Sequence, residues 1–403
     1  MAWPKALLKG IGRDQGPQLW FSSNFTPAGS GTVTVQQPQT ADLSRPSEGV
    51  LIVVRYRAAI GVAAYSSLNA EAPQNLLQQV RLYGNNSRTG STVPFFGSGA
   101  SLFALDSMFD TSGVGGKQYL TNSVSAGVVR QPRLSSPVGL TIGTAVGEFG
   151  GVASYDIETH YFIPFGPFGG NPVQGMLFSQ RDSDWNRTMA ISLVFSGATT
   201  TGAADNFGVK AGTTTLTFTA FGSASGSPQV NVYLIPTLQQ SATGAVVSQY
   251  TPGVIQRNVA SPATAPTANA TNSLLSLLQN YDTPNIVVKA GVVTSLGDYS
   301  SLSDSILTKL YLTVGGKPVV QFNDEFSQKD WYEQKTQGLF PQGYTAINFV
   351  GAGYKMHWAR IFKAPVAGTQ WNLSADIAGA SNQQCEIFQE QVLVEPAVIG
   401  ATP

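Results

Sequence analysis

The sequence predicts an all-β protein built from two tandem barrels of the same design. Three observations lead to this prediction: short apolar segments alternate with glycine, proline and asparagine clusters, the same succession of segments occurs twice, and helical patterns are few. Short runs rich in valine, isoleucine, threonine and aromatic residues are typical of strands. A chain of 403 residues also suits two domains better than one core.

Twelve segments have the length and composition of strands, in two groups. The first group is 50–60, 76–83, 155–163, 189–195, 213–221 and 230–235, and the second is 286–293, 306–314, 344–350, 354–362, 371–377 and 385–394. Helical patterns are limited to residues 101–109, 273–279 and 325–334. Many short strands with few helices indicate a sandwich or a barrel.

An internal repeat links the two groups. GVLIVVR at 49–55 resembles PNIVVK at 284–289, and LLQQVRL at 76–82 resembles ILTKLYL at 306–312. The second block of each copy runs into a glycine-containing pair suited to a tight hairpin turn. Three further matches keep the order: Pro94-Phe95 with Gln321-Phe322, MAISLVFSGA at 189–198 with WNLSADIAGA at 371–380, and YLIP at 233–236 with LVEP at 393–396. The shared order indicates a duplication.

Eight strands in each copy, with a short helix between early strands, describe a jelly roll. We therefore expect two tandem eight-stranded jelly-roll barrels, a double jelly roll with short helices and long loops. An Ala/Pro/Thr tract between the copies cannot form a core and favours a linker. The expected domains are an N-terminal arm over 1–18, a first jelly roll with long loops over 19–240, a linker over 241–284 and a second jelly roll over 285–403.

This arrangement resembles the double jelly-roll major capsid proteins of tailless icosahedral bacteriophages with an internal membrane, the tectivirus-like and corticovirus-like coats. The adenovirus hexon is a larger relative. The resemblance covers nearly the whole chain and rests on architecture and duplication. It implies a homotrimer that forms a pseudo-hexagonal tile of the virion shell, assembled in the host cytoplasm, with minor capsid and vertex proteins as further partners. It also implies no catalytic residues, and it places trimer contacts and the outer surface in the long loops over 86–154 and 199–227.

The low charge of the chain agrees with a subunit that associates with copies of itself. Only 11% of the residues are charged, and 23 basic residues balance 23 acidic ones. Charge normally opposes association, so its scarcity favours homotypic contacts. The scattered, balanced charges argue against specific nucleic-acid binding. Because the first 13 residues lack a signal-peptide pattern and no long apolar run occurs, we expect folding in a cytoplasm.

Residues that could support chemistry are scarce. The chain has two histidines, His160 and His357, and its one cysteine, Cys385, has no CxxC partner. The acidic pairs Asp182/Asp184 and Asp324/Glu325 lack EF-hand spacing and are typical of solvated turns. We therefore expect no catalytic, cofactor-binding or metal-binding residue, and no enzyme activity.

One segment suggests a partner. The N-terminal arm has three cations with no acid before Asp14, and its apolar residues fall at helical spacing after Pro4. Such an arm would lie on an anionic lipid surface or pack under a neighbouring subunit, and both alternatives stay open. The candidate contact residues are Trp3, Lys5, Leu7, Leu8, Lys9, Ile11 and Arg13.

Two other functional classes remain. A lectin-like tandem jelly roll would bind carbohydrate through exposed aromatics, with Trp185, Trp331 and Trp371 as candidates, although these fall at positions expected in the core. A jelly-roll enzyme of cupin or glycosidase type would need more histidines than the chain provides.

Overall fold

The protein is represented by a computed structural model of all 403 residues. The structure describes residues 17–25, 33–37, 47–60, 74–86, 90–109, 117–122, 131–134, 154–165, 168, 185–195, 216–236, 253–260, 269–278, 282–293, 299–322, 343–348, 371–378 and 383–394.

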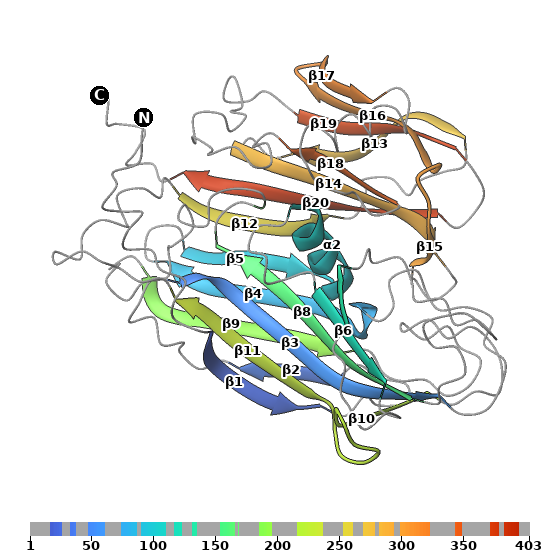
Figure 1. The fold of residues 1–403 in the computed structure, drawn as a ribbon. Helices are drawn as coiled ribbons and strands as arrows, with labels where there is room; N and C mark the ends of the chain where they lie inside the picture. Colours follow the sequence, from blue (N-terminus) through green and yellow to red (C-terminus); the bar gives the residue numbers. More distant parts are fainter. Residues whose placement is uncertain are drawn as a thin grey trace.

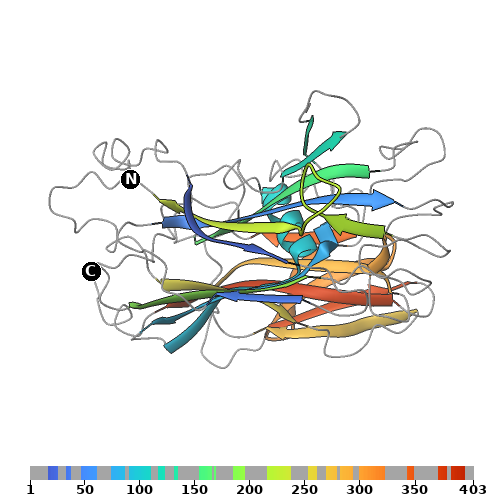
Figure 2. The ribbon, with the colours of Figure 1, turned by 90° about the horizontal axis from the view of Figure 1, so that it is seen from below.

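The first barrel consists of two antiparallel sheets, which lie as two layers in Figure 2. Sheet A1 has the order β1 (Gln18–Asn24), β11 (Gln229–Pro236), β3 (Ser47–Ile60), β8 (Ser154–Pro164), β6 (Lys117–Asn122) and β7 (Gln131–Leu134), with β10 (Leu216–Thr219) also paired to β3. Sheet B1 has the order β2 (Val33–Gln37), β9 (Trp185–Phe195), β4 (Leu77–Asn86) and β5 (Gly90–Gly97).

The second barrel repeats this plan (Figure 1). Sheet A2 has the order β12 (Gly253–Ala260), β20 (Gln383–Val394), β14 (Asp282–Val293) and β15 (Tyr299–Leu302), with β18 (Tyr344–Asn348) also paired to β14. Sheet B2 has the order β13 (Ala270–Leu278), β19 (Trp371–Ile377), β16 (Leu307–Val314) and β17 (Lys317–Phe322).

The two barrels have the same topology. The path β1-β11-β3-β8 corresponds to β12-β20-β14-β18, and β2-β9-β4-β5 corresponds to β13-β19-β16-β17. The repeated sequence blocks fall on corresponding strands, and equivalent residues such as Val54 and Val288 both lie in the apolar cores. The predicted double jelly-roll fold is confirmed. The predicted match of Phe95 with Phe322 differs from the structure by two residues. Phe95 pairs with Leu82, and the residue that pairs with the equivalent Leu312 is Val320.

The expectation of a linker over 241–284 differs from the observed pairing. Strand β12 pairs along its whole length with β20, and β13 pairs with β19, so both belong to the sheets of the second barrel. The helix expected over 273–279 is wrong for the same reason, since β13 places Leu275 in the second core. Tertiary packing here outweighs a local helical pattern. Two asparagines with positive φ, Asn269 and Asn272, mark the turn and bulge at its start.

The helix expected over 101–109 is confirmed as α2 (Gly99–Phe109), which follows β5. Ser98 caps it: the Ser101 N–H donates to Ser98 Oγ at 3.1 Å, and the Leu102 N–H donates to the Ser98 carbonyl oxygen at 3.0 Å. The helix packs against β4, β8 and the short 3-10 helix η1 (Gln74–Leu76). The strand expected over 354–362 and the helix over 325–334 lie outside the described residues.

Each barrel has its own core of alternating inward residues. In the first barrel, Phe25 stacks on Phe195 with ring centroids 3.8 Å apart, and Phe103 of α2 meets Tyr161 of β8 edge to face. In the second barrel, Trp371 is completely buried. Neither helix in the described part of the chain has the length and apolar character needed to span a bilayer.

Candidate functional site

Most residues singled out from the sequence lie outside the described part of the chain. These are the whole N-terminal arm (Trp3, Lys5, Leu7, Leu8, Lys9, Ile11 and Arg13), together with His357, Trp331, Asp182, Asp184, Asp324 and Glu325. Trp371 is a core residue and offers no exposed platform for a sugar ring. Cys385 faces the second core, and burial raises the pKa of its thiol to about 12.

His160 lies on the outer face of sheet A1, in a row of charged side chains. The Glu158 carboxylate accepts from Arg55 Nε at 2.6 Å and lies 2.8 Å from His160 Nε2. Its own exposed fraction is only 3%, so the carboxylate is desolvated and needs such partners. The histidine and the acid come from the same strand, β8, and the arginine from its neighbour β3. The contacts with Arg55 and His160 therefore hold the Glu158 carboxylate in place.

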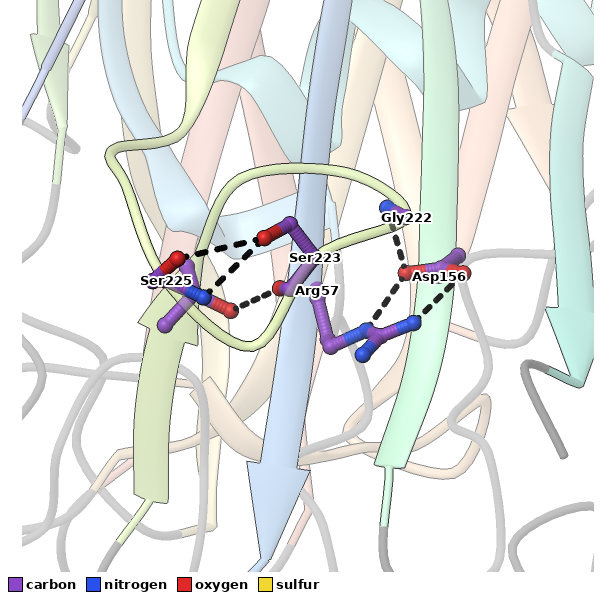
Figure 3. Close-up of polar contacts among 6 residues, drawn as sticks. Arg57, Asp156, Gly222, Ser223 and Ser225 are labelled. Atoms are coloured by element: carbon purple, nitrogen blue, oxygen red, sulfur yellow. Dashed lines mark hydrogen bonds and ion pairs between the residues drawn. The ribbon is translucent and has the colours of Figure 1, made fainter.

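Two residues further along the same two strands, a second ion pair holds a loop in place. The Arg57 guanidinium donates to both Asp156 oxygens, from Nε at 2.9 Å and Nη2 at 3.3 Å. The same carboxylate accepts the Gly222 N–H at 2.9 Å (Figure 3). Gly222 has φ +75°, a conformation that favours glycine. The Asp156 hydrogen bond also raises the pKa of Arg57.

The loop held by Asp156 runs from β10 to β11 and is closed by its own hydrogen bonds. Thr219 Oγ1 donates to the Ser223 carbonyl oxygen at 2.8 Å, and the Ser225 N–H donates to Ser223 Oγ at 3.2 Å (Figure 3). Asp156 and Glu158 therefore serve structure: each carboxylate is paired with an arginine of β3. Among the described residues, no three His, Cys, Asp or Glu side chains come together as a metal site would require.

The outer face of sheet A1 changes from charged to apolar along its strands. Cross-strand register aligns Leu19, Tyr233, Leu51 and Phe162 in one row across β1, β11, β3 and β8. Leu51 and Phe162 are buried, whereas Leu19 at the edge strand is 53% exposed. Leu19 is the one large apolar side chain classed as exposed within the described ranges.

The two barrels meet at a junction that is largely apolar. Phe388 of β20 packs against Phe95 of β5, with ring centroids 5.7 Å apart. Gly97 makes room for the Phe388 ring, since a Cβ there would collide with its Cζ atom. Residues from the outer face of the second barrel join the apolar cluster of the first: Val287, Leu302, Tyr344, Ala346 and Phe388.

Buried polar groups add specific contacts at the same junction. Lys289 Nζ lies 2.8 Å from Glu386 Oε2 and 3.5 Å from Ser101 Oγ of α2. The backbone of Phe168, beyond β8, is held by two side chains of the second barrel: its N–H donates to Glu390 at 3.1 Å and its carbonyl accepts from Asn285 at 3.1 Å. Asn285 Nδ2 also donates to Glu390 Oε1 at 2.6 Å.

This junction is the feature that sequence reasoning missed. A signal was present, because Lys289 interrupts an otherwise apolar strand and Gly97 ends a strand beside α2. The sequence around these two residues does not predict which residues of the other barrel they contact. The described residues thus form two barrels joined through a buried junction, with one apolar side chain exposed at the edge of sheet A1.

No family model matches the sequence, and no curated protein matches it. Solved structures do match. The crystal structure of the STIV MCP is 12% identical with a TM-score of 0.52, covering 96% of this chain and 98% of that one. The atomic structure of Sulfolobus turreted icosahedral virus is 13% identical with a TM-score of 0.52, covering 96% and 92%. The major capsid protein P2 from bacteriophage PM2 is 10% identical with a TM-score of 0.47, covering 94% and 98%. The first two likenesses establish the double jelly-roll fold over nearly the full chain.

Proposed function

We propose that this chain is the major capsid protein of a tailless icosahedral virus and has no enzyme activity. The observation that carries the proposal is the double jelly roll itself. Two barrels that share one eight-strand order occupy nearly the full length of the chain, and the STIV MCP matches 96% of it. Fold alone does not dictate function. The rest of the proposal therefore draws on the charge, the junction and the edges of the sheets.

The junction supports a role as a rigid building block. A flexible pair of domains would present its two outer surfaces at variable angles and could not tile a shell. Here an apolar cluster continues from the first barrel into the second, and buried polar side chains of the second barrel bond to Ser101 and to the Phe168 backbone of the first. Three such subunits would supply six barrels to a pseudo-hexagonal tile, with the virion shell as the product.

The composition supports extensive contact between copies. With 11% charged residues and balanced signs, the chain lacks the electrostatic repulsion that keeps monomers apart. Obligate interfaces commonly bury more than about 2,000 Å². We propose a stable homotrimer that then forms the capsid lattice, with minor capsid and vertex proteins at its margins and no specific contact with nucleic acid.

The N-terminal arm extends the proposal to a membrane. Its cations Lys5, Lys9 and Arg13 and its apolar residues Trp3, Leu7, Leu8 and Ile11 suit the inner face of a shell that encloses a lipid layer, as in an internal-membrane phage. Each cation would contribute about 1 kcal/mol near an anionic surface, and many arms would act together. A clamp beneath a neighbouring subunit is the alternative role for this arm.

Mass in solution tests the main proposal. Three chains of 42.5 kDa should give a particle of about 127 kDa by light scattering, and electron microscopy should show hexagonal outlines. A monomer at micromolar concentration would contradict the proposal. Specific retention on a glycan array by such a monomer would favour the carbohydrate-binding alternative instead.

Deleting residues 2–13 tests the arm. We expect the trimer to keep its melting temperature within a few degrees, since exposed termini contribute little to a core. Binding to liposomes with anionic lipid at low salt should fall. If the truncated chain bound liposomes as well as the full chain, the membrane role would be wrong.

A further inference from the structure

The two barrels differ on the outer faces of their B sheets. Alternate residues of the central strands lie in the barrel cores: Val80, Leu82, Ile191 and Leu193 in sheet B1, and their equivalents Leu310, Leu312, Leu373 and Ala375 in sheet B2. Because successive side chains of a strand point to opposite sides of the sheet, the residues between them form the outer face of each sheet. The shared topology allows the two outer faces to be compared position by position.

The outer face of B1 carries the less polar residue at most equivalent positions. Cross-strand register gives the pairs, each with the B1 residue first: Val194 and Asp376, Ala190 and Asn372, Tyr83 and Thr313, Phe96 and Gln321, and Gln79 and Lys309. One pair is reversed, since Arg81 stands at the position of Tyr311. A solvated face of an antiparallel sheet usually carries polar residues. The B2 face has that character, and the B1 face does not.

The B1 face has the composition of a protein interface. Phe96, Tyr83 and Val194 are half-buried within the chain, and Arg81 is exposed beside them. Among the outer positions of B1 whose side chains the structure describes, Arg81 is the one charged residue. Its guanidinium carbon lies 5.3 Å from the centroid of the Tyr83 ring. Aromatic residues and arginine are enriched at interfaces, and a guanidinium that stacks on a ring is more weakly hydrated than an ammonium. A second protein surface would therefore cover this face at a modest electrostatic cost.

The occupant that matches this face is a second copy of the chain. Every copy carries the face, and the proposed shell consists mostly of this chain, so a partner needed once per face is another copy. The B2 face of that copy is a poor match. Its Asp376 carboxylate already accepts from the Asn272 N–H and the Tyr311 hydroxyl. Lys309 is 44% exposed there and would repel Arg81. Two B1 faces instead bring apolar and aromatic residues together without covering polar groups that lack partners.

We propose that the outer face of sheet B1 packs against the same face of a second copy, across a two-fold axis between neighbouring tiles. The inference deepens the proposed capsid function and rests on it. The same surface is used on both copies, so the contact is isologous. The two Arg81 side chains are related by the axis and meet only where it passes beside them. A three-fold tile with a two-fold contact on each subunit joins every tile to its neighbours, as an extended sheet or a closed shell requires.

The second barrel supplies the substitutions that test this contact. Tyr83→Thr with Phe96→Gln gives the B1 face the residues that B2 has at these positions, which the same topology accommodates. We expect this double variant to trimerise normally, while association of its trimers requires at least about tenfold higher concentration, as measured by light scattering on a concentration series. Lys309→Gln makes the reverse exchange on B2 and should leave both steps unchanged. If the double variant associates like the wild type, or if wild-type trimers stay separate at every concentration, the inference fails while the capsid proposal stands.

Hydroxyl-radical footprinting of the wild-type chain tests the face without any substitution. Tyr83 and Phe96 should lose reactivity when free trimers associate, whereas Tyr311, on the outer face of B2, serves as the reference and should not. Unchanged reactivity of Tyr83 and Phe96 in the assemblies would overturn the proposal. Protection of Tyr311 together with Tyr83 would show that unlike faces meet, and would overturn the two-fold contact. A wild-type chain that stays monomeric at every concentration would defeat the capsid proposal itself, a result distinct from the others.

Discussion

Replacing Gly97 by alanine should weaken the junction between the barrels. The new Cβ would collide with Cζ of Phe388, while Cε1 of that ring and Cζ of Phe95 lie 3.1 Å away. The Phe388 ring is buried and packs against Phe95, so it has little room to move away from the new Cβ. Overpacking of this kind typically costs about 1–3 kcal/mol.

A double-mutant cycle isolates this collision from other effects. Phe388→Leu alone should cost about 1–2 kcal/mol, because it removes ring atoms from a buried position. Combined with Gly97→Ala, it removes the atoms that the new Cβ would strike. The double variant should therefore be less destabilised than the sum of the two single variants.

Urea unfolding followed by tryptophan fluorescence measures the cycle. Protein concentration must be held constant, since association stabilises the folded chain. Additive free energies, or a Gly97→Ala variant as stable as the wild type, would refute the packing described for this junction. A matched control is Gly316→Ala, where an added Cβ meets no atom and any cost arises from its positive φ of +78° alone.

Three further predictions concern charged groups. Asp156→Ala should remove the acceptor for Gly222 and the partner of Arg57, lowering stability by about 1–3 kcal/mol and accelerating hydrogen exchange in the 220–227 loop. Lys289→Met should destabilise the chain by leaving Glu386 without this cation, and adding Glu386→Leu should recover part of the loss in thermal melts. The pKa of Asp376 is lowered first by the Asn272 N–H and also by Tyr311 and Lys309. The ionised Asp376 therefore stabilises the fold above the ordinary aspartate pKa, and this stabilisation is lost as pH falls through the lowered folded-state value. In Asp376→Asn, the melting temperature should depend less on pH between roughly pH 5 and pH 2.

Much of the architecture could be predicted from local patterns. The alternation along 371–377 and 385–394 marks strands that pair over nearly those residues, because side-chain period and burial are directly linked. The duplication could be recognised in the sequence because equivalent strands pack on equivalent cores. Val54 and Val288, for example, are both apolar because each is buried in the core of its barrel. A repeated topology leaves a repeated hydrophobic pattern even where few residues are identical.

The parts of the fold that could not be predicted from the sequence depend on contacts between distant segments. β12 contains Gln256, Arg257 and Asn258, a polar run that does not read as a strand until β20 lies beside it. β13 has leucines at spacings compatible with either a helix or a bulged strand, and only its pairing with β19 decides between them. The packing of the Phe388 ring against Gly97 likewise depends on how the two barrels are placed relative to each other, which no local sequence pattern specifies.

The buried position of Cys385 shields its thiol from oxidants and thiol reagents. Burial raises the pKa of this thiol to about 12, so the thiolate, which is the reactive form, is scarce at neutral pH. The sequence has no second cysteine with which it could pair. A fluorophore or spin label attached through a cysteine introduced on the surface would therefore report from that position alone, even within an assembly holding many copies of the chain.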